Sequence, residues 1–406
     1  MSVVSRLSRI SSEDVSDQIS SYRCLIEEIV TSPSSSSSVS DGIIAVISHV
    51  LGDVQRPVGG SVMLYIAENL HRLSDDALVS VGTAAVSALK QNANSYDEAD
   101  YVLREALFSF YIKQEMFSDA GQVLAGLNLD SNQKTYTNEE KVDIYIRCAE
   151  AFLEDGEGNE AEIFLNKASP MMHSVSEWSL QLRFSVTLAR VLDFNRKFID
   201  AALRYYDLST TQNRQVVQSD LLELYGKAIT CAVLGRAGPQ RTRILAVLHK
   251  DERYEQLDRT ESLTSHGAIL SKMHNNEIVR PEEMSAFEKY LMPHQLATTA
   301  DGFTLPEKAV IEHNVLAARR VFRNMYFTAL AQLLRLDVSM AQKVASKMIS
   351  EGRLKAWMDE TEGLLYFDNG EGTEFQEWNE SIRDTCDELT YCVDKIQSQG
   401  LGVDIA

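Results

Sequence analysis

The chain of 406 residues carries 59 acidic and 39 basic side chains, giving a formal net charge of −20. Nucleic-acid binding gains affinity by neutralising phosphates, so this balance argues against a nucleic-acid-binding protein. The five cysteines include no CxxC pair, which argues against zinc knuckles and disulfide frameworks. No apolar run approaches the roughly 20 residues that a membrane span needs, and the first residues lack a secretory apolar stretch. We therefore expect a cytoplasmic and nuclear protein with no membrane contact.

Residues 1–95 are predicted to form an N-terminal segment of short amphipathic helices with one break. The break is TSPSSSSSVSDG (31–42), a serine-rich stretch that is too polar to pack. We predict a loop or flexible connector there, with a phosphorylation target as the alternative.

Residues 96–290 show the 3.6-residue apolar period of helices and a longer repeat. Three segments share an alanine that is followed four residues later by a large side chain: Ala120/Leu124, Ala161/Leu165 and Ala201/Tyr205. The alanines are 41 and 40 residues apart, a period typical of stacked helix pairs in which a small side chain lets the next helix approach closely. We predict a mostly α fold, a right-handed α-solenoid of TPR-like helix pairs; coincidence among alanine-rich helices is the alternative.

Residues 307–370 change character and predict a winged helix. Helices are expected at 307–325, 327–336 and 338–354, followed by a β-hairpin at 355–368 whose turn spans Asp359–Gly363. Three helices followed by a two-stranded wing is winged-helix order. The expected core residues are Leu330, Leu333, Leu334, Val344 and Met348.

The hairpin is a candidate joining surface, because a strand edge with unpaired backbone groups can pair with a neighbouring subunit. The residues assigned to this wing edge are Trp357, Met358, Leu364, Leu365, Tyr366 and Phe367.

Residues 371–406 are predicted to form a C-terminal bundle helix with a tail. Large apolar side chains recur there at steps of three and four on an otherwise acidic helix, the geometry of a helix that packs in a bundle or coiled coil. We assign partner binding to Phe375, Trp378, Ile382, Leu389, Val393 and Ile396. Packing on the chain's own domain is the alternative.

Residues 291–306 are predicted to form an exposed insertion loop with a regulatory role. Pro293 and Pro306 bracket the segment, and the residues between them favour turns. A loop of this length is uncommon unless it is functional or disordered, so a connector without a role is the alternative. The candidate contact residues are Met292, Pro293, His294, Gln295, Thr298, Thr299 and Asp301.

The sequence contains no recognisable catalytic constellation. Its eight histidines form no HxH or HExxH pair, and neither GxxxxGK[ST], GxGxxG nor GxSxG occurs. The acidic turns EDGEGNE (154–160) and DNGEGTE (368–374) lack the ligand spacing of calcium loops. We predict no catalytic residue, no cofactor and no metal site, although an enzyme of unrecognised type remains an alternative.

One basic cluster bears on a competing hypothesis, a winged-helix DNA-binding protein. Basic residues lie on and around the third helix, where such a protein presents its recognition helix: Arg335, Lys343, Lys347, Arg353 and Lys355. Acidic residues crowd the same end, at Glu351 and in the wing. An acidic protein partner or a solvated face is the favoured interpretation.

Taken together, the chain resembles the PCI-domain family, the scaffold subunits of the proteasome lid, the COP9 signalosome and a translation initiation factor. Within that family it looks most like a signalosome subunit over residues 97–400. The segments that carry this resemblance are YIRCAEAFLEDGEGNEAEIFLNKAS (145–169), ARVLDFNRKFIDAALRYYDLS (189–209), LHKDERYEQL (248–257), LMPHQLATTADG (291–302) and EKAVIEHNVLAA (307–318).

The resemblance implies a non-catalytic scaffold that helps to sense substrate. The signalosome removes the ubiquitin-like modifier Nedd8 from cullin–RING ligases with a metal-dependent isopeptidase in another subunit. In such complexes the winged helices join edge to edge, the C-terminal helices form one bundle, and the helical arm faces the neddylated substrate. The implied partners are the other signalosome subunits, with a proteasome-lid scaffold as the alternative within the family.

Overall fold

The structure is a computed structural model of the chain. It describes residues 3–10, 15–31, 36–90, 96–129, 136–211, 217–257, 261–299 and 301–368, together with 378, 381–383, 385, 386, 388–391, 393 and 395. The chain divides into two compact units, Met1–Lys197 (unit 1) and Phe198–Ala406 (unit 2).

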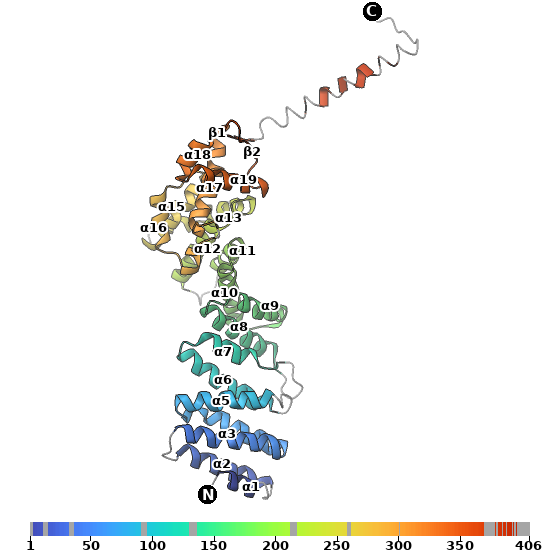
Figure 1. The fold of residues 1–406 in the computed structure, drawn as a ribbon, viewed down its shortest axis with the longest axis vertical. Coiled ribbons are helices and arrows are strands. Elements are labelled where there is room, and N and C mark those ends of the chain that lie inside the picture. Colours follow the sequence, from blue (N-terminus) through green and yellow to red (C-terminus); the bar gives the residue numbers. More distant parts are fainter. Residues whose placement is uncertain are drawn as a thin grey trace, which may run out of the picture. The chain divides into compact units, whose positions relative to one another are not determined.

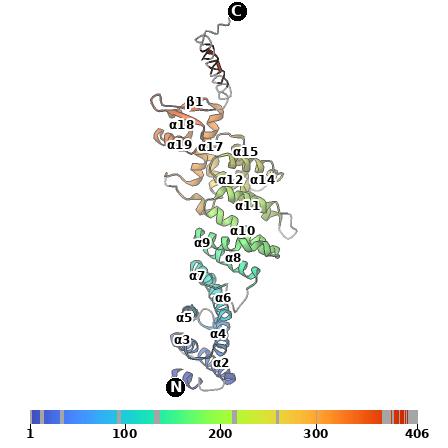
Figure 2. The same cartoon turned by 90° about the vertical axis from the view of Figure 1, so that its right-hand side faces the viewer.

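Unit 1 is a stack of helices in which neighbours along the chain pack on each other, as α6 does on α7, α7 on α8 and α8 on α9 (Figures 1 and 2). One apolar core runs through the stack, from Leu7 to Val191. The helices are α1 (Val3–Ile10), α2 (Val15–Thr31), α3 (Ser36–Asp53), α4 (Arg56–Asn69), η1 (Leu70–Arg72), α5 (Asp75–Lys90), α6 (Asp97–Lys113), α7 (Phe117–Ala125), α8 (Asn138–Glu154), α9 (Gly158–Ala168), η2 (Ser169–Ser174) and α10 (Trp178–Phe194).

The alanine repeat is a packing repeat. Ala120 on α7, Ala161 on α9 and Ala201 on α11 (Phe198–Ser209) are all fully buried. The large residue four positions after each alanine is also buried, at Leu124, Leu165 and Tyr205. The predicted stack of helix pairs is therefore confirmed, because each small side chain lies at a close helix–helix contact.

The same period appears in the turns within the helix pairs. Glu115, Gly156 and Arg196 adopt left-handed φ values of 58°, 88° and 60°, and Asn276 follows with 58° two periods later. Each turn is closed by the bond that defines a Schellman motif: the N–H of Met116 donates to Tyr111, that of Glu157 to Phe152, that of Lys197 to Leu192 and that of Glu277 to Lys272. Only one of the four left-handed turn residues is glycine, so this recurring turn cannot be recognised in the sequence from glycine spacing.

Ion pairs link successive helix pairs in unit 1. Arg147 on α8 binds Glu105 on α6 at 2.6 Å, and Arg183 on α10 binds Asp143 on α8 at 2.9 Å. Arg190 on α10 reaches Glu154 at the end of α8 at 2.7 Å. Ion pairs that are partly open to water add little stability. These pairs join alternate helices, α6 to α8 and α8 to α10, so the ion pairs recur with the helix pairs.

The serine-rich stretch is helical in its second half, contrary to the predicted loop. Helix α3 begins at Ser36, and Val39 and Ser40 are buried. Ile43 and Ile47 continue the same buried face. Burial of this face outweighs the weak helix propensity of serine. Residues 32–35 lie outside the described residues.

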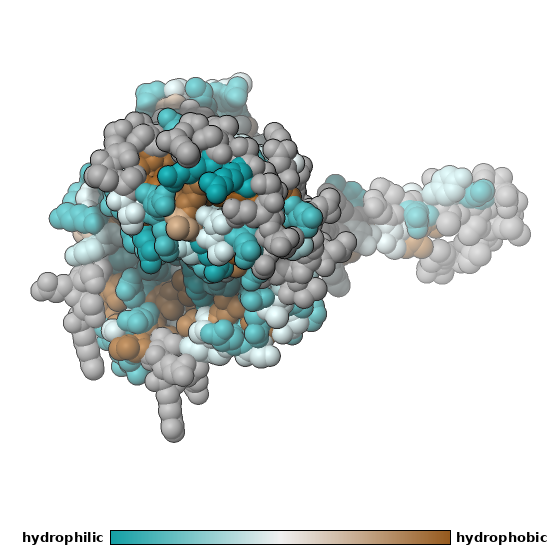
Figure 3. Space-filling model, turned by 90° about the horizontal axis from the view of Figure 1, so that it is seen from below, coloured by the Kyte–Doolittle hydropathy of each residue, from teal (hydrophilic) through white to brown (hydrophobic). Residues whose placement is uncertain are grey.

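The N-terminal end of unit 1 is largely polar. Helix α2 buries one stripe, formed by Tyr22, Leu25 and Ile26, and most of its other described side chains are exposed or half-buried. Figure 3 shows this end as mostly hydrophilic, with small apolar patches between the polar side chains.

Unit 2 continues with helix pairs and ends in a small sheet. Helices α11 and α12 pack together, α13 packs on α15, and α12 contacts the long helix α17. The elements after α11 are α12 (Gln218–Leu234), α13 (Pro239–His249), α14 (Tyr254–Leu257), α15 (Glu261–Asn275), α16 (Pro281–Glu288), η3 (Pro293–Leu296), α17 (Leu305–Val321), β1 (Asn324–Tyr326), α18 (Phe327–Leu334), α19 (Val338–Ser350), β2 (Ala356–Asp359) and β3 (Leu364–Phe367).

Helix α17 buries three consecutive polar residues, and each has a partner. Asn314 pairs with the backbone of Val279, accepting its N–H at 2.9 Å and donating to its carbonyl at 3.0 Å. His313 donates from Nε2 to the Glu277 carbonyl at 2.9 Å, and Glu312 binds Arg353. Buried polar groups must be satisfied in this way. The three contacts therefore fix the segment after α15 and the end of α19 on α17.

Helices α17, α18 and α19 and the hairpin β2–β3 form the predicted winged helix, with one strand that the sequence analysis missed. Leu330, Leu334 and Met348 are buried in its core, with Leu333 and Val344 partly buried against them, as predicted. Helix α17 begins at Leu305 and ends at Val321, so the prediction of one helix over 307–325 is wrong at both ends. Residues 324–326 instead form β1, which pairs antiparallel with β3.

Candidate assembly surfaces of unit 2

Strand β1 changes which backbone edges of the sheet are free. The strand order is β1-β3-β2, with β3 paired antiparallel on both sides. The expectation that Leu364–Phe367 offers a free edge is therefore wrong. Leu365 and Phe367 are also buried in the winged-helix core, so their side chains are not available to a partner. Within the described sheet, the free edges belong to β1 and β2.

The outer face of the sheet carries exposed aromatic side chains. Side chains alternate between the two faces of a strand, and the register places Trp357 beside Tyr366 on the face opposite the core. Their rings stack with centroids 4.0 Å apart and planes 6° apart. Trp357 is 56% exposed and Tyr326 on β1 is 60% exposed. Met358 is instead partly buried against the core.

Two residues before β1 in the chain, Val321 and Phe322, are also exposed. Exposure of Tyr326, Val321 and Phe322 was not predicted, because the helical pattern of the sequence places them in or beside a helix. An exposed apolar patch of this kind is typical of a protein–protein contact.

The C-terminal segment presents its apolar stripe to solvent. The described residues between 378 and 395 are helical. Trp378, Ile382, Leu389 and Val393 are 72%, 50%, 60% and 47% exposed. Phe375 and Ile396, the two remaining members of the predicted seam, lie outside the described residues. The chain itself does not cover these four side chains in the structure.

The insertion loop is more ordered than predicted. Pro293 opens the short helix η3, Thr298 and Thr304 form a bridge, and Pro306 lies in the first turn of α17, where a missing N–H costs nothing. Gln295 is buried and accepts the N–H of Met292 at 3.1 Å, so its assignment as a partner contact is wrong. Met292 and Thr298 are exposed, whereas His294 and Thr299 are half-buried.

Most of the basic residues around α19 are tied to carboxylates. Lys347 contacts Asp301 at 3.3 Å, Arg335 contacts Glu282 at 3.5 Å, and Arg353 binds both Glu312 and Glu351. These pairs reduce the charge that a DNA phosphate would meet.

Among the described residues, no group of three or more histidine, cysteine, aspartate or glutamate side chains is placed to hold a metal ion. In the same part of the chain, no helix has the length and apolarity that a membrane crossing requires.

A stack of helix pairs that ends in a winged helix with an ordered β1 defines a PCI-domain protein. Two family models agree with this architecture: one described as PSMD12/CSN4, N-terminal, matches residues 10–219, and one described as PCI domain matches residues 291–369.

Proteins that align with most of this chain identify the branch of the PCI-domain family to which it belongs. The chain is 33% identical to the COP9 signalosome complex subunit 4 of Arabidopsis thaliana, over 88% of this chain and 90% of the relative. It is 33% identical to the protein of that name from Drosophila melanogaster, over 94% and 90%. Identity to the one from Dictyostelium discoideum is 34%, over 86% of both chains. The chain belongs to the COP9 signalosome subunit 4 family.

Proposed function

We propose that this chain is a non-catalytic scaffold subunit of a COP9 signalosome in the cytoplasm and nucleus. In this role it holds other subunits together and helps the complex to recognise neddylated cullin–RING ligases, from which a metal-dependent isopeptidase in another subunit removes Nedd8. Family membership favours the signalosome over the proteasome lid. The chain's own contribution is assembly, through the winged helix and the C-terminal helix.

The exposed stripe of the C-terminal helix carries this proposal. Ile382 and Leu389 are one heptad apart, and Trp378 and Val393 lie on the same side of the helix. Burying a large aliphatic side chain stabilises a contact by about 1.5–3 kcal/mol. A stripe of this kind on a soluble chain is typical of a helix that packs against partner helices, and an assembly bundle supplies them.

The double variant Ile382→Asp/Leu389→Asp tests the proposal. Two carboxylates in the seam would have to be buried without partners. We therefore expect the variant to be lost from the complex when it is co-expressed with the other subunits and isolated through one of them. Recovery relative to wild type is measured by quantitative mass spectrometry.

The control is Tyr391→Asp, which places one such carboxylate on the opposite side of the same helix, where Tyr391 is 64% exposed. The control should co-purify at the wild-type level. Equal recovery of the double variant and the control, with unchanged circular dichroism, would show that the stripe does not hold the chain in the complex.

A further inference from the structure

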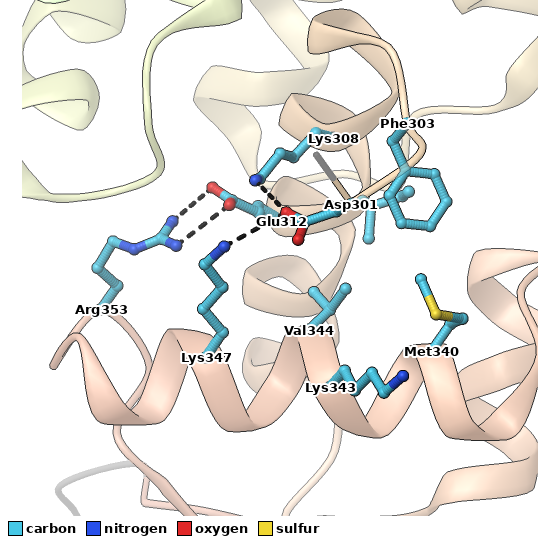
Figure 4. Close-up of a pocket in the computed structure, with 10 residues that line it drawn as sticks. Asp301, Phe303, Lys308, Glu312, Met340, Lys343, Val344, Lys347 and Arg353 are labelled. Carbon is cyan, nitrogen blue, oxygen red and sulfur yellow. Dashed lines mark hydrogen bonds and ion pairs between the residues drawn. The ribbon is translucent and has the colours of Figure 1, made fainter. Parts of the chain in front are cut away.

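A pocket of about 310 Å³ is lined by Asp301 and Phe303 and by residues of α17 and α19, and none of its lining residues belongs to the aromatic face of the sheet or to the C-terminal stripe (Figure 4). Its apolar floor is formed by Phe303, Ile311, Met340 and Val344. Its rim is cationic, with Lys308, Lys343 and Lys347. The pocket thus combines an apolar surface with a positive edge on a chain whose net charge is −20.

The positive charge at the rim is only partly neutralised. Asp301 accepts Lys308 at 2.6 Å and Lys347 at 3.3 Å, so one carboxylate serves two lysines. Lys343 has no acidic partner within 4.0 Å among the described residues. The lysine hydrogen bonds hold the pKa of Asp301 below its ordinary value.

The second carboxylate of the pocket is screened from an incoming ligand. Glu312 is buried and binds Arg353 through both oxygens. The buried Arg241 also interacts electrostatically with Glu312, and burial lowers the pKa of Arg241 to about 10. The charge of Glu312 is therefore already engaged by guanidinium groups inside the protein, which weakens its opposition to an anion at the rim.

Asp301 lies on a turn that forms without its carboxylate. The N–H of Thr299 donates to the Phe303 carbonyl at 2.7 Å, and Gly302, with φ of 87°, donates to Thr299 at 3.0 Å. The Asp301 side chain is 42% exposed. It is thus an accessible carboxylate on a turn whose backbone bonds do not depend on it.

We propose that this pocket is a docking site for an acidic segment of a partner protein. A carboxylate of the partner replaces Asp301 on Lys347 and binds Lys343, while a neighbouring apolar side chain fills the floor. Charge complementarity selects an acidic ligand, and the apolar floor selects a peptide over a bare anion or a nucleic-acid backbone. The site is independent of the C-terminal stripe, so its failure and that of the assembly proposal are separable.

The probe is a short fluorescein-labelled peptide in which glutamates alternate with phenylalanine and leucine, titrated with the full-length chain by fluorescence anisotropy. One comparison peptide has glutamine for every glutamate, and a second has serine for phenylalanine and leucine. We expect the acidic apolar peptide to bind and both comparison peptides to bind about tenfold more weakly, because each lacks one of the two kinds of contact.

Two variants act in opposite directions. Lys343→Gln/Lys347→Gln should weaken binding about tenfold, whereas Lys289→Gln/Lys355→Gln, which removes two exposed lysines outside the pocket, should leave it unchanged. Asp301→Asn should strengthen binding several-fold, because it removes the competing carboxylate. Thermal unfolding by circular dichroism checks that each variant is folded.

Several results would overturn the inference. One is the absence of peptide binding to both the wild type and Asp301→Asn. Another is weaker binding by a folded Asp301→Asn variant, which would make Asp301 a part of the site and not a competitor. A third is tighter, Lys343-dependent binding of tripolyphosphate or duplex DNA than of the peptide, which would assign the lysines to phosphate.

Discussion

At the scale of single residues, the polar centre of α17 shows what the sequence hides. Glu312, His313 and Asn314 stand inside a helix whose other buried residues are apolar, and periodicity treats them as solvent-facing. Their partners, at Arg353, Glu277 and Val279, lie more than 30 residues away along the chain. The core leucines could be predicted from local spacing, because burial follows the helical period. The polar contacts could not be predicted in this way, because their partners are distant in the sequence.

Burial of His313 predicts a pH dependence. Its surroundings lower its pKa to about 4, mainly through burial and then through the charge of Arg241. In the unfolded chain the ordinary pKa of about 6.5 applies. Between pH 4 and pH 6.5 the imidazole of His313 is protonated in the unfolded chain but neutral in the folded chain. The free energy of unfolding is therefore at its full value above pH 6.5 and falls as the pH drops toward 4. The loss reaches about 3 kcal/mol.

The variant His313→Gln removes this titration. The opening free energy of α17, measured by hydrogen exchange at pH 7 and at pH 4.5, should fall by about 2–3 kcal/mol more in the wild type than in the variant. A wild-type and a variant protein that lose the same stability over this range would show that His313 is not buried in its neutral form.

At the scale of elements, the helix pairs were predictable and the short strand was not. Three alanines at a fixed spacing were enough to predict the repeat, because each marks a close helix contact. Strand β1 has only three residues, Asn324–Tyr326, too few for an alternation to be told from a helical pattern. It becomes a strand by pairing with β3, a contact about 40 residues away along the chain. Because β1 covers one edge of β3, the free edges of the sheet are those of β1 and β2, and Tyr326 lies on the exposed face.

The repeated turns give a prediction about stability. Arg196 and Gly156 occupy equivalent positions in successive turns, both with left-handed φ. The left-handed conformation costs a non-glycine residue about 1–2 kcal/mol. Glycine avoids this cost but loses more conformational entropy on folding. Arg196→Gly should therefore raise the free energy of unfolding by up to about 1 kcal/mol.

The measurement is the urea midpoint, with Gly156→Ala as the opposite change. A Cβ at Gly156 would be 3.6 Å from Phe194, an ordinary contact, so the variant tests φ and not space. Gly156→Ala should lower the midpoint while Arg196→Gly raises it. The reverse order would mean that the two turns do not share a left-handed conformation.

At the scale of the whole molecule, the fold class and the family were accessible from the sequence, and the surfaces only in part. The predicted bundle residues Trp378, Ile382, Leu389 and Val393 are exposed, and their contact with partner helices stays a prediction. The predicted wing contacts Leu365 and Phe367 are core residues, and the exposed aromatic face lies on the other side of the sheet. Apolar character alone does not tell a buried residue from an interface residue, because both come from the same side-chain types.

Native purification shows whether the chain is a scaffold within a signalosome, as we propose. The chain is tagged, isolated from its own cells at physiological salt, and the co-purifying proteins are quantified by mass spectrometry. We expect to recover the other signalosome subunits in near-equal amounts, including the metal-dependent isopeptidase subunit. Three results would contradict the proposed function: recovery of the chain without partners, recovery with proteasome-lid subunits, or recovery with DNA-bound proteins.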